Sequence, residues 1–395
     1  MHILYGTPQG LTARRAQFWD QNSPGILGTA TGEAFGYVLA AEDLDADGLD
    51  DLAVGAVDDT VGDVGFAGSV NVIYGSDAGL TAEGNQLWNQ ASPGIADDPE
   101  EFDDFGNSMA AADLNGDGYP DLAIGIPNEG FGSHENVGAV EVLYSSAQGI
   151  TADGSQFWTQ NSQGIRDPAE SGDFVGQRVA AGDMNRDGYA DLAVGVPLED
   201  VGGVEDAGAV NVIYGSPAGL AAHGNQFWSQ DSPGVGGRAE ASDQLGFGLT
   251  VADFDLDGFA DLVAGAYDDH VRTNEQVGAV NVLRGSARGL TAFGGQFWSQ
   301  DTPGVREVAE SGDVFGIDTA PGDFNGDGYM DLAIGAGGDS VGAVLGAGVV
   351  NVIYGAESGL QAKAPEDQVW SEDGTGVGDG SEEDDGFGLE VGAAS

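Results

Sequence analysis

Hydrophobic residues along the chain gather in short runs, which are separated by segments rich in Gly, Asp, Asn, Ser and Pro. The first clear group of four runs lies at 35–43, 51–57, 69–75 and 85–90. Their β-branched and aromatic content favours strands over helices. The first two runs are apolar or small on both faces, which predicts burial on both sides. The third run alternates, so we expect it to lie closer to solvent.

The four runs recur with a period of 70 residues. Each group opens with a Phe-Gly dipeptide or a close variant, and all six tryptophans occupy one position of the repeat. Repeat units of this kind share one continuous core instead of folding separately. We therefore predict an all-β fold, a β-propeller with one four-stranded blade per repeat. The dipeptides are Phe35-Gly36, Phe105-Gly106, Val175-Gly176, Leu245-Gly246 and Phe315-Gly316.

The same period sets the expected blade boundaries. One β-propeller domain should occupy 1–395, with about six blades, the last of them split between the chain ends or incomplete. Because the acidic loop of a sixth unit would begin where the chain stops, we interpret the chain as a fragment of a six- or seven-bladed protein. The predicted segments are a partial blade at 1–34, blades at 35–104, 105–174, 175–244, 245–314 and 315–386, and the start of a closing blade at 387–395.

An acidic loop of pattern D-x-[DN]-x-D-G-x-x-D begins eight residues after the start of each dipeptide. Positions one, three and five place oxygen-bearing side chains around a common centre, and glycine at position six allows a sharp turn. A backbone carbonyl at position seven and Asp at position nine complete the shell. Ca²⁺ prefers such oxygen-only ligation. Solvated turns that bind nothing are the alternative, but converging carboxylates repel one another without a cation.

The loops predict about five Ca²⁺ ions per chain, with the structural role of tying the first strand of each blade to the second. They are not EF-hand loops, which need a Glu at position twelve and flanking helices, because position twelve is apolar in all five copies. The predicted ligands, with a backbone carbonyl at the fourth member of each set, are Asp43, Asp45, Asp47, Leu49 and Asp51; Asp113, Asn115, Asp117, Tyr119 and Asp121; Asp183, Asn185, Asp187, Tyr189 and Asp191; Asp253, Asp255, Asp257, Phe259 and Asp261; and Asp323, Asn325, Asp327, Tyr329 and Asp331.

The composition limits the classes of partner that the chain can bind. The formal net charge is −55, so nucleic acid is excluded as a partner and an anionic bilayer is disfavoured. The chain has no cysteine, which excludes disulfides and thiol chemistry. No apolar run approaches membrane-spanning length, so we expect no membrane insertion.

The Phe-Gly dipeptide, the acidic loop and a Gly-Ala-Pro-like turn such as "GIP" at 125 or "GVP" at 195 together resemble the FG-GAP repeat of integrin α-subunit propellers. The segment "GAVNVIYGS" is similar to segments of bacterial cell-surface FG-GAP proteins. Val175 and Leu245 depart from the Phe of the pattern but conserve its packing and leave the acidic loops intact. The resemblance implies a calcium-stabilised, extracellular or cell-surface propeller that serves adhesion or ligand recognition, although fold alone does not fix function.

The face opposite the acidic loops carries the longer and more variable connections, such as 92–104 and 126–139. We predict that a protein or carbohydrate ligand binds there. An acidic residue also precedes each dipeptide by two positions, which indicates a structural hydrogen bond, with a second cation site as the alternative. These residues are Glu33, Asp103, Asp173, Asp243, Asp313 and Asp385.

No nucleophile–base pair stands out in the sequence, so we predict that the chain is not an enzyme. A catalytic site should break the symmetry of the repeat, and His270 with Arg272 is the only candidate for that. The predicted function is an extracellular adhesion or ligand-recognition module with structural calcium. The alternatives are the propeller domain of a calcium-dependent carbohydrate-active enzyme and a structural spacer of a larger surface protein.

Overall fold

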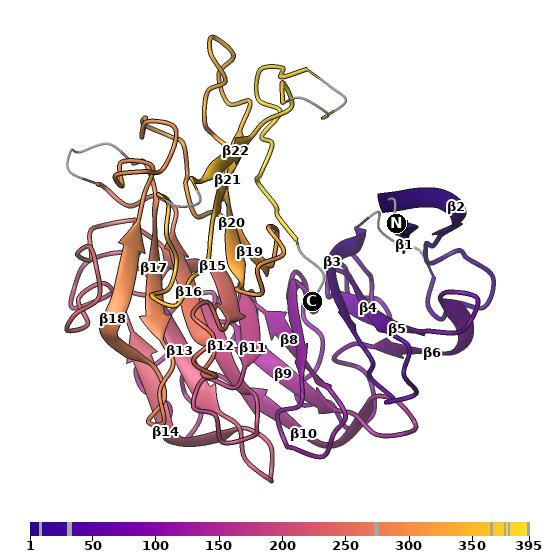
Figure 1. The fold of residues 1–395 in the computed structure, drawn as a ribbon. Helices are drawn as coiled ribbons and strands as arrows, with labels where there is room; N and C mark the ends of the chain where they lie inside the picture. The colour runs from indigo at the N-terminus through magenta and orange to yellow at the C-terminus, as the bar shows by residue number, and fades with distance from the viewer. Residues whose placement is uncertain are drawn as a thin grey trace.

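The computed structural model describes residues 1–7, 10–29, 34–271, 276–363, 366–374, 377 and 380–392. All regular secondary structure in this part of the chain is β-strand, in five four-stranded sheets and one two-stranded sheet. The sheets follow one another side by side around a common centre (Figure 1). The predicted all-β propeller of four-stranded blades is thereby confirmed with five complete blades. The sixth, closing blade stays a prediction.

Each blade is a meander in which every strand pairs antiparallel with the next along the chain. The N-terminal hairpin contains β1 (His2–Thr7) and β2 (Gly10–Phe18). Blade 1 contains β3 (Phe35–Glu42), β4 (Asp51–Ala56), β5 (Ser69–Tyr74) and β6 (Thr81–Trp88). Blade 2 contains β7 (Ser108–Ala112), β8 (Asp121–Ile126), β9 (Ala139–Tyr144) and β10 (Thr151–Trp158).

The remaining three blades repeat this arrangement. Blade 3 contains β11 (Val179–Gly182), β12 (Asp191–Val196), β13 (Ala209–Tyr214) and β14 (Ala221–Trp228). Blade 4 contains β15 (Leu245–Ala252), β16 (Asp261–Ala266), β17 (Ala279–Arg284) and β18 (Thr291–Trp298). Blade 5 contains β19 (Thr319–Gly322), β20 (Asp331–Ala336), β21 (Val349–Ile353) and β22 (Gln368–Trp370).

The burial of the first and third strands differs from the prediction. The third strands are buried almost throughout, whereas β3 alternates between exposed and half-buried residues. The first strands of neighbouring blades contact one another at the centre of the propeller, while the second and third strands lie between adjacent sheets. Asn71 on β5 is therefore fully buried, and its amide donates a hydrogen bond to the Leu27 carbonyl at 3.0 Å. The fourth strand also begins earlier than predicted, at Thr81 in blade 1.

Glycines hold neighbouring blades close together. A Cβ atom at Gly55 on β4 would lie 2.4 Å from the carbonyl oxygen of Gly106, and one at Gly125 would lie 2.1 Å from that of Gly176. Gly106 also has a φ of +91°, a conformation that favours glycine. This close approach explains why the Phe-Gly dipeptide of one blade recurs together with a glycine in the second strand of the preceding blade.

The acidic loops are anchored in the hydrophobic core between blades. The second residue of the loop is fully buried in blades 1 to 4, where Leu44, for example, packs with Phe105 and Leu122 of the next blade. The corresponding residue in blade 5, Phe324, is 49% exposed. The four buried residues are Leu44, Leu114, Met184 and Phe254. Packing of this residue fixes the start of the acidic loop against the next sheet in blades 1 to 4.

Candidate metal centre

Each acidic loop is the hairpin turn between the first and second strands of a blade. Its ninth residue is the first residue of the second strand and is buried in all five blades. In blade 2, Asp121 accepts a hydrogen bond from the backbone N–H of Leu114 at 3.0 Å and another from that of Ser145 at 2.9 Å. This carboxylate therefore links the hairpin to the turn that follows the third strand. Equivalent bonds to the turn after the third strand are made by Asp51, Asp191, Asp261 and Asp331.

The side chains at positions one, three and five curl inward over the turn. Asp113 accepts hydrogen bonds from the N–H groups of Asp117 and Gly118 at 3.1 and 2.9 Å, and Asn115 Oδ1 accepts one from Asp117 at 2.8 Å. The residue at position seven, here Tyr119, donates its N–H to the Asp117 carboxylate at 3.0 Å. The bonds to positions one and five recur in the other four loops.

In two of the loops, oxygen atoms of the predicted ligands lie close together. In blade 1, oxygens of Asp43, Asp45 and Asp51 lie within 4.8 Å of one another. In blade 4, the same holds for Asp253, Asp255 and Asp257. The donor atoms are all oxygens, in the separation that a single cation can bridge. The residues therefore fit a hard divalent cation such as Ca²⁺.

Without a nearby positive charge, burial destabilises the ionised form of the carboxylate at position nine. Burial raises the pKa of Asp121 and of Asp191 to about 7, although backbone N–H groups oppose this effect and nearby loop carboxylates add to it. Burial raises the pKa of Asp51 to about 6 for the same reasons. A cation would favour the ionised form of these groups.

The fourth hairpin differs from the others, and the sequence prediction missed the difference. Arg284, the last residue of β17, places its guanidinium against two loop carboxylates, with Nη2 at 2.8 Å from Asp255 and Nη1 bonded to Asp261. The other four blades carry tyrosine at this position, namely Tyr74, Tyr144, Tyr214 and Tyr354. A position-by-position comparison of the repeats would have revealed it. In the fourth loop, the guanidinium of Arg284 thus supplies a positive charge to the loop carboxylates.

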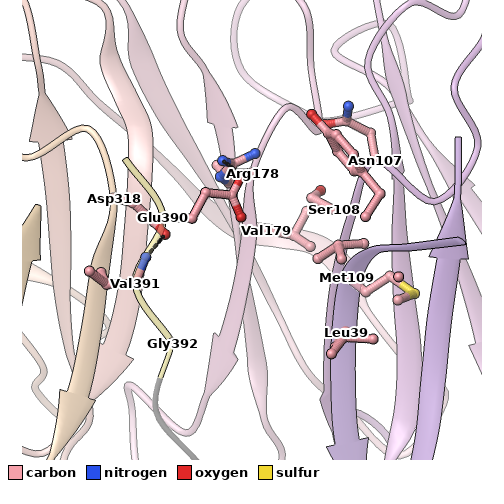
Figure 2. Close-up of a pocket in the computed structure, with 13 residues that line it drawn as sticks. Leu39, Asn107, Ser108, Met109, Arg178, Val179, Asp318, Glu390, Val391 and Gly392 are labelled. Carbon is pink, nitrogen blue, oxygen red and sulfur yellow. Dashed lines mark hydrogen bonds and ion pairs between the residues drawn. The ribbon is translucent and has the colours of Figure 1, made fainter. Parts of the chain in front are cut away.

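A second departure from symmetry lies at the centre of the propeller. A cavity of about 380 Å³ is lined by residues of the first strands and by the segment 390–392 (Figure 2). Arg178 reaches into it and lies 3.8 Å from the Glu390 carboxylate, and its charge also opposes the burial that raises the pKa of Asp318. Arg178, Asp318 and Glu390 share one repeat position, at which the sequence predicts no site. Of the asymmetric pair His270 and Arg272, Arg272 lies outside the described residues.

The fold and the hairpins define the class, a β-propeller with an acidic, oxygen-lined loop in every complete blade. The FG-GAP repeat matches this chain at 105–143, 175–213 and 315–350. The phosphatidylinositol-glycan-specific phospholipase D of Rattus norvegicus is 32% identical over 182 residues, which are 46% of this chain and 20% of that protein. Integrin alpha-3 of Cricetulus griseus is 32% identical over 181 residues, 46% of this chain and 16% of that protein. The chain therefore contains FG-GAP repeats, in a β-propeller that is similar to those of integrin α subunits.

The chain spans a fifth or less of the length of these two relatives. Among solved structures, the rhamnogalacturonan lyase YesW has a TM-score of 0.40 and 13% identity, over 87% of this chain and 56% of the lyase. Among the described residues, none forms a helix that is long and apolar enough to cross a membrane.

Proposed function

We propose that the chain is a calcium-binding propeller that serves as an extracellular adhesion or ligand-recognition module, with calcium in a structural role. The observation that carries the proposal is the recurrence of one oxygen-lined hairpin in all five complete blades, with the same internal hydrogen bonds. The similarity to integrin alpha-3 supports the recognition role and the extracellular location.

Calcium bound in a hairpin would neutralise carboxylates that converge on one point. In blade 2 it would be held by Asp113, Asn115, Asp117 and Asp121, with the backbone carbonyl of Tyr119. Because Asp121 also accepts the N–H of Ser145, its fixed position connects the first three strands of the blade. The ion would therefore stiffen one end of the sheet and leave the opposite face free for a ligand.

The ligand face is proposed to be the one that carries the connections 92–104 and 126–139, together with their counterparts. Antiparallel order places these two connections at the opposite end of the blade from the acidic hairpin. Their length and variation among the repeats support recognition of a protein or carbohydrate there.

Calcium titration by calorimetry after chelation, with thermal unfolding recorded in parallel, tests the structural role. We expect at least four hairpin ions per chain and a melting temperature that rises by ten degrees or more, on the order of several kcal/mol of binding free energy. Absence of binding, or unfolding that is indifferent to a chelator, would contradict the proposal.

A further inference from the structure

A second group of carboxylates lies at the opposite end of the blades from the acidic hairpins, at the junction of blades 1 and 2. Glu100 and Asp103 belong to the segment that enters blade 2, and Glu129 belongs to the turn after β8. One oxygen atom from each lies within 4.8 Å of the other two. Asp103 and Glu129 are buried, whereas Glu100 is exposed, so the cluster opens to solvent on the side of Glu100.

Two buried oxygen atoms in this cluster have no hydrogen-bond partner. Gln90, which follows β6, is 3% exposed, and its Nε2 donates to Glu129 Oε2 at 2.6 Å. Its own Oε1 and the Oε1 of Glu129 remain unpartnered. A hydrogen bond from the Gln90 side chain also opposes the burial that raises the pKa of Asp103. The amide head of Gln90 is thus directed into the carboxylate cluster.

Among the described residues, no positively charged side chain forms an ion pair with any of the three carboxylates of the cluster. Burial raises the pKa of Glu129 to about 8, and the charges of Asp103, Asp97 and Glu100 raise it further. Buried charges in proteins are normally paired or coordinate a metal. Unpartnered oxygens, negative charge and an opening to solvent are together what a hard cation requires.

The hydrogen bonds of this cluster recur at three later junctions between blades. Each has a buried Gln whose Nε2 donates to the acidic residue after the second strand at 2.6 Å, and in each the Gln Oε1 is unpartnered. Each also has a Glu and an Asp in the segment that enters the blade, and the Asp accepts the backbone N–H of the Glu. The sets are Gln160, Glu170, Asp173 and Glu199; Gln230, Glu240, Asp243 and Asp269; and Gln300, Glu310, Asp313 and Asp339.

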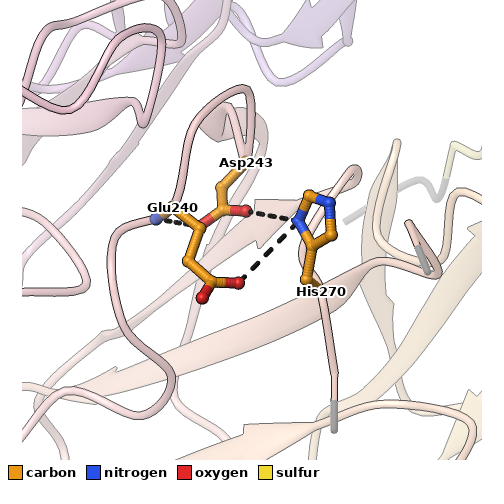
Figure 3. Close-up of side chains that lie close together, drawn as sticks. All are labelled: Glu240, Asp243 and His270. Carbon is orange, nitrogen blue, oxygen red and sulfur yellow. Dashed lines mark hydrogen bonds and ion pairs between the residues drawn. The ribbon is translucent and has the colours of Figure 1, made fainter. Parts of the chain in front are cut away.

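At one of these junctions a histidine lies beside the corresponding carboxylates. At the junction of blades 3 and 4, His270 Nδ1 lies 3.4 Å from Asp243 Oδ1 and 3.9 Å from Glu240 Oε2 (Figure 3). These two carboxylates correspond to Asp103 and Glu100. The position of His270 holds Gly130 at the junction of blades 1 and 2, so no side chain enters the cluster there. One ligand atom from each of Glu240, Asp243 and His270 lies within 4.8 Å of the other two, as in the cluster at the junction of blades 1 and 2.

We propose that Glu100, Asp103, Glu129 and the side-chain oxygen of Gln90 form a site for a hard divalent cation such as Ca²⁺, separate from the acidic hairpins. The ion fastens the segment that enters blade 2 to the turn after β8. Through Gln90, which follows β6, it also joins blade 1 to blade 2, whereas a hairpin ion links strands within one blade. It also fixes two connections on the face that we assign to ligand recognition.

Equilibrium dialysis against Ca²⁺ alone, with the full chain, tests this site by counting bound ions. Glu129→Gln should lower the count by one, because it removes a charged ligand and keeps the shape of the side chain. Glu135→Gln is the matched control, since Glu135 is an exposed residue of the same connection, and it should leave the count unchanged. A hairpin variant, Asp117→Asn, should lower the count independently, so that the double variant loses two ions. An unchanged count in Glu129→Gln would overturn the proposal.

A second measurement does not depend on a variant. Crystals of the wild-type chain grown with Mn²⁺, which also accepts oxygen ligands, should show an anomalous peak between Glu100, Asp103 and Glu129. Peaks confined to the acidic hairpins would overturn the junction site while leaving the calcium role of the hairpins intact. A peak at the junction without peaks at the hairpins would support the junction site and contradict the calcium role of the hairpins. Circular dichroism of Glu129→Gln confirms that its sheet structure is retained.

Discussion

Glu141 occupies a buried position on β9 at which the other four blades carry asparagine. In blades 1, 3 and 5, the asparagine amide donates to a backbone carbonyl of the preceding segment. An ionised glutamate cannot donate in this way. Burial accordingly raises the pKa of Glu141 from its ordinary value of 4.5 to about 8, against a smaller opposing effect of the Ser155 hydroxyl. The protonated carboxylic acid is thus the form that suits the folded protein.

This shift predicts a pH-dependent stability that depends on one residue. Between pH 4.5 and about 8, the unfolded chain releases the Glu141 proton while the folded protein retains it, so the free energy of unfolding falls as the pH rises. The slope from this group is at most about 1.4 kcal/mol per pH unit. Glu141→Gln should therefore match the wild type at pH 4.5 and exceed its stability by a few kcal/mol at pH 8, measured by urea unfolding in calcium. Equal stability at both values would contradict the assignment. The exposed Glu83→Gln is the control.

Arg284 is the other single residue that changes the chemistry of its blade. Its guanidinium already pairs with Asp255 and Asp261, so a cation in the fourth hairpin must displace it or bind beside it. We predict that this loop has the lowest calcium affinity of the five. Arg284→Tyr, which introduces the residue of the other blades, should strengthen the weakest binding step by about tenfold or more, since removing a nearby positive charge alters such energies by more than 1 kcal/mol. If calorimetric titration of Arg284→Tyr gave the same affinity for the weakest calcium-binding step as in the wild type, this prediction would be wrong.

At the scale of the structural element, the acidic hairpin is a turn held by its own side chains. Its ninth residue bonds to the turn after the third strand in all five blades, and its second residue packs in the core between blades in blades 1 to 4. In those four blades the intervening residues are therefore fixed at both ends before any ion binds. In blade 5, where the second residue is half exposed, the ninth residue alone provides this anchor.

Loss of one anchoring carboxylate should disable one hairpin. Asp121→Ala leaves the N–H groups of Leu114 and Ser145 without their acceptor, which costs about 2–6 kcal/mol if each unpartnered group costs about 1–3 kcal/mol. We expect the variant to bind one calcium ion fewer and to melt at a lower temperature, measured by dialysis and calorimetry. Asp153→Asn, an exposed change on β10 of the same blade, should alter neither quantity. A full ion count in Asp121→Ala would show that the residue is not a ligand.

At the scale of the whole molecule, the formal charge of −55 is the dominant electrostatic fact. The hairpin ions proposed here would offset only a minor part of it. Repulsion among the remaining carboxylates opposes the compact state, and salt screens this repulsion, with a Debye length that falls from about 10 Å at 0.1 M to about 3 Å at 1 M.

Stability should consequently increase with sodium chloride concentration, most steeply after chelation. Without divalent ions, the melting temperature should rise by several degrees between 0.1 and 1 M salt, and the rise should be smaller in the presence of calcium. Differential scanning calorimetry at four salt concentrations, with and without calcium, measures both slopes. Equal slopes would mean that divalent ions do not relieve the repulsion within the hairpins.

The sequence alone determined the period, the four strands of each repeat and the position of every acidic hairpin. It could do so because each depends on residues close together in the chain: a Gly at a sharp turn, Asp or Asn at fixed spacing, and β-branched runs between them. The ring of oxygens in a hairpin is likewise a local structure, so spacing was enough to anticipate that Asp43, Asp45 and Asp51 converge.

Only the tertiary structure decided what depends on the packing of one blade against the next. It buried the third strands, which the sequence predicted to lie closer to solvent. Alternation along a strand cannot show that neighbouring sheets cover both of its faces. It brought Arg284 into the fourth hairpin and Arg178 into the central cavity. It also joined Gln90 and Glu129, 39 residues apart, at the junction of two blades. These contacts are set by the stacking of sheets, which no local pattern specifies.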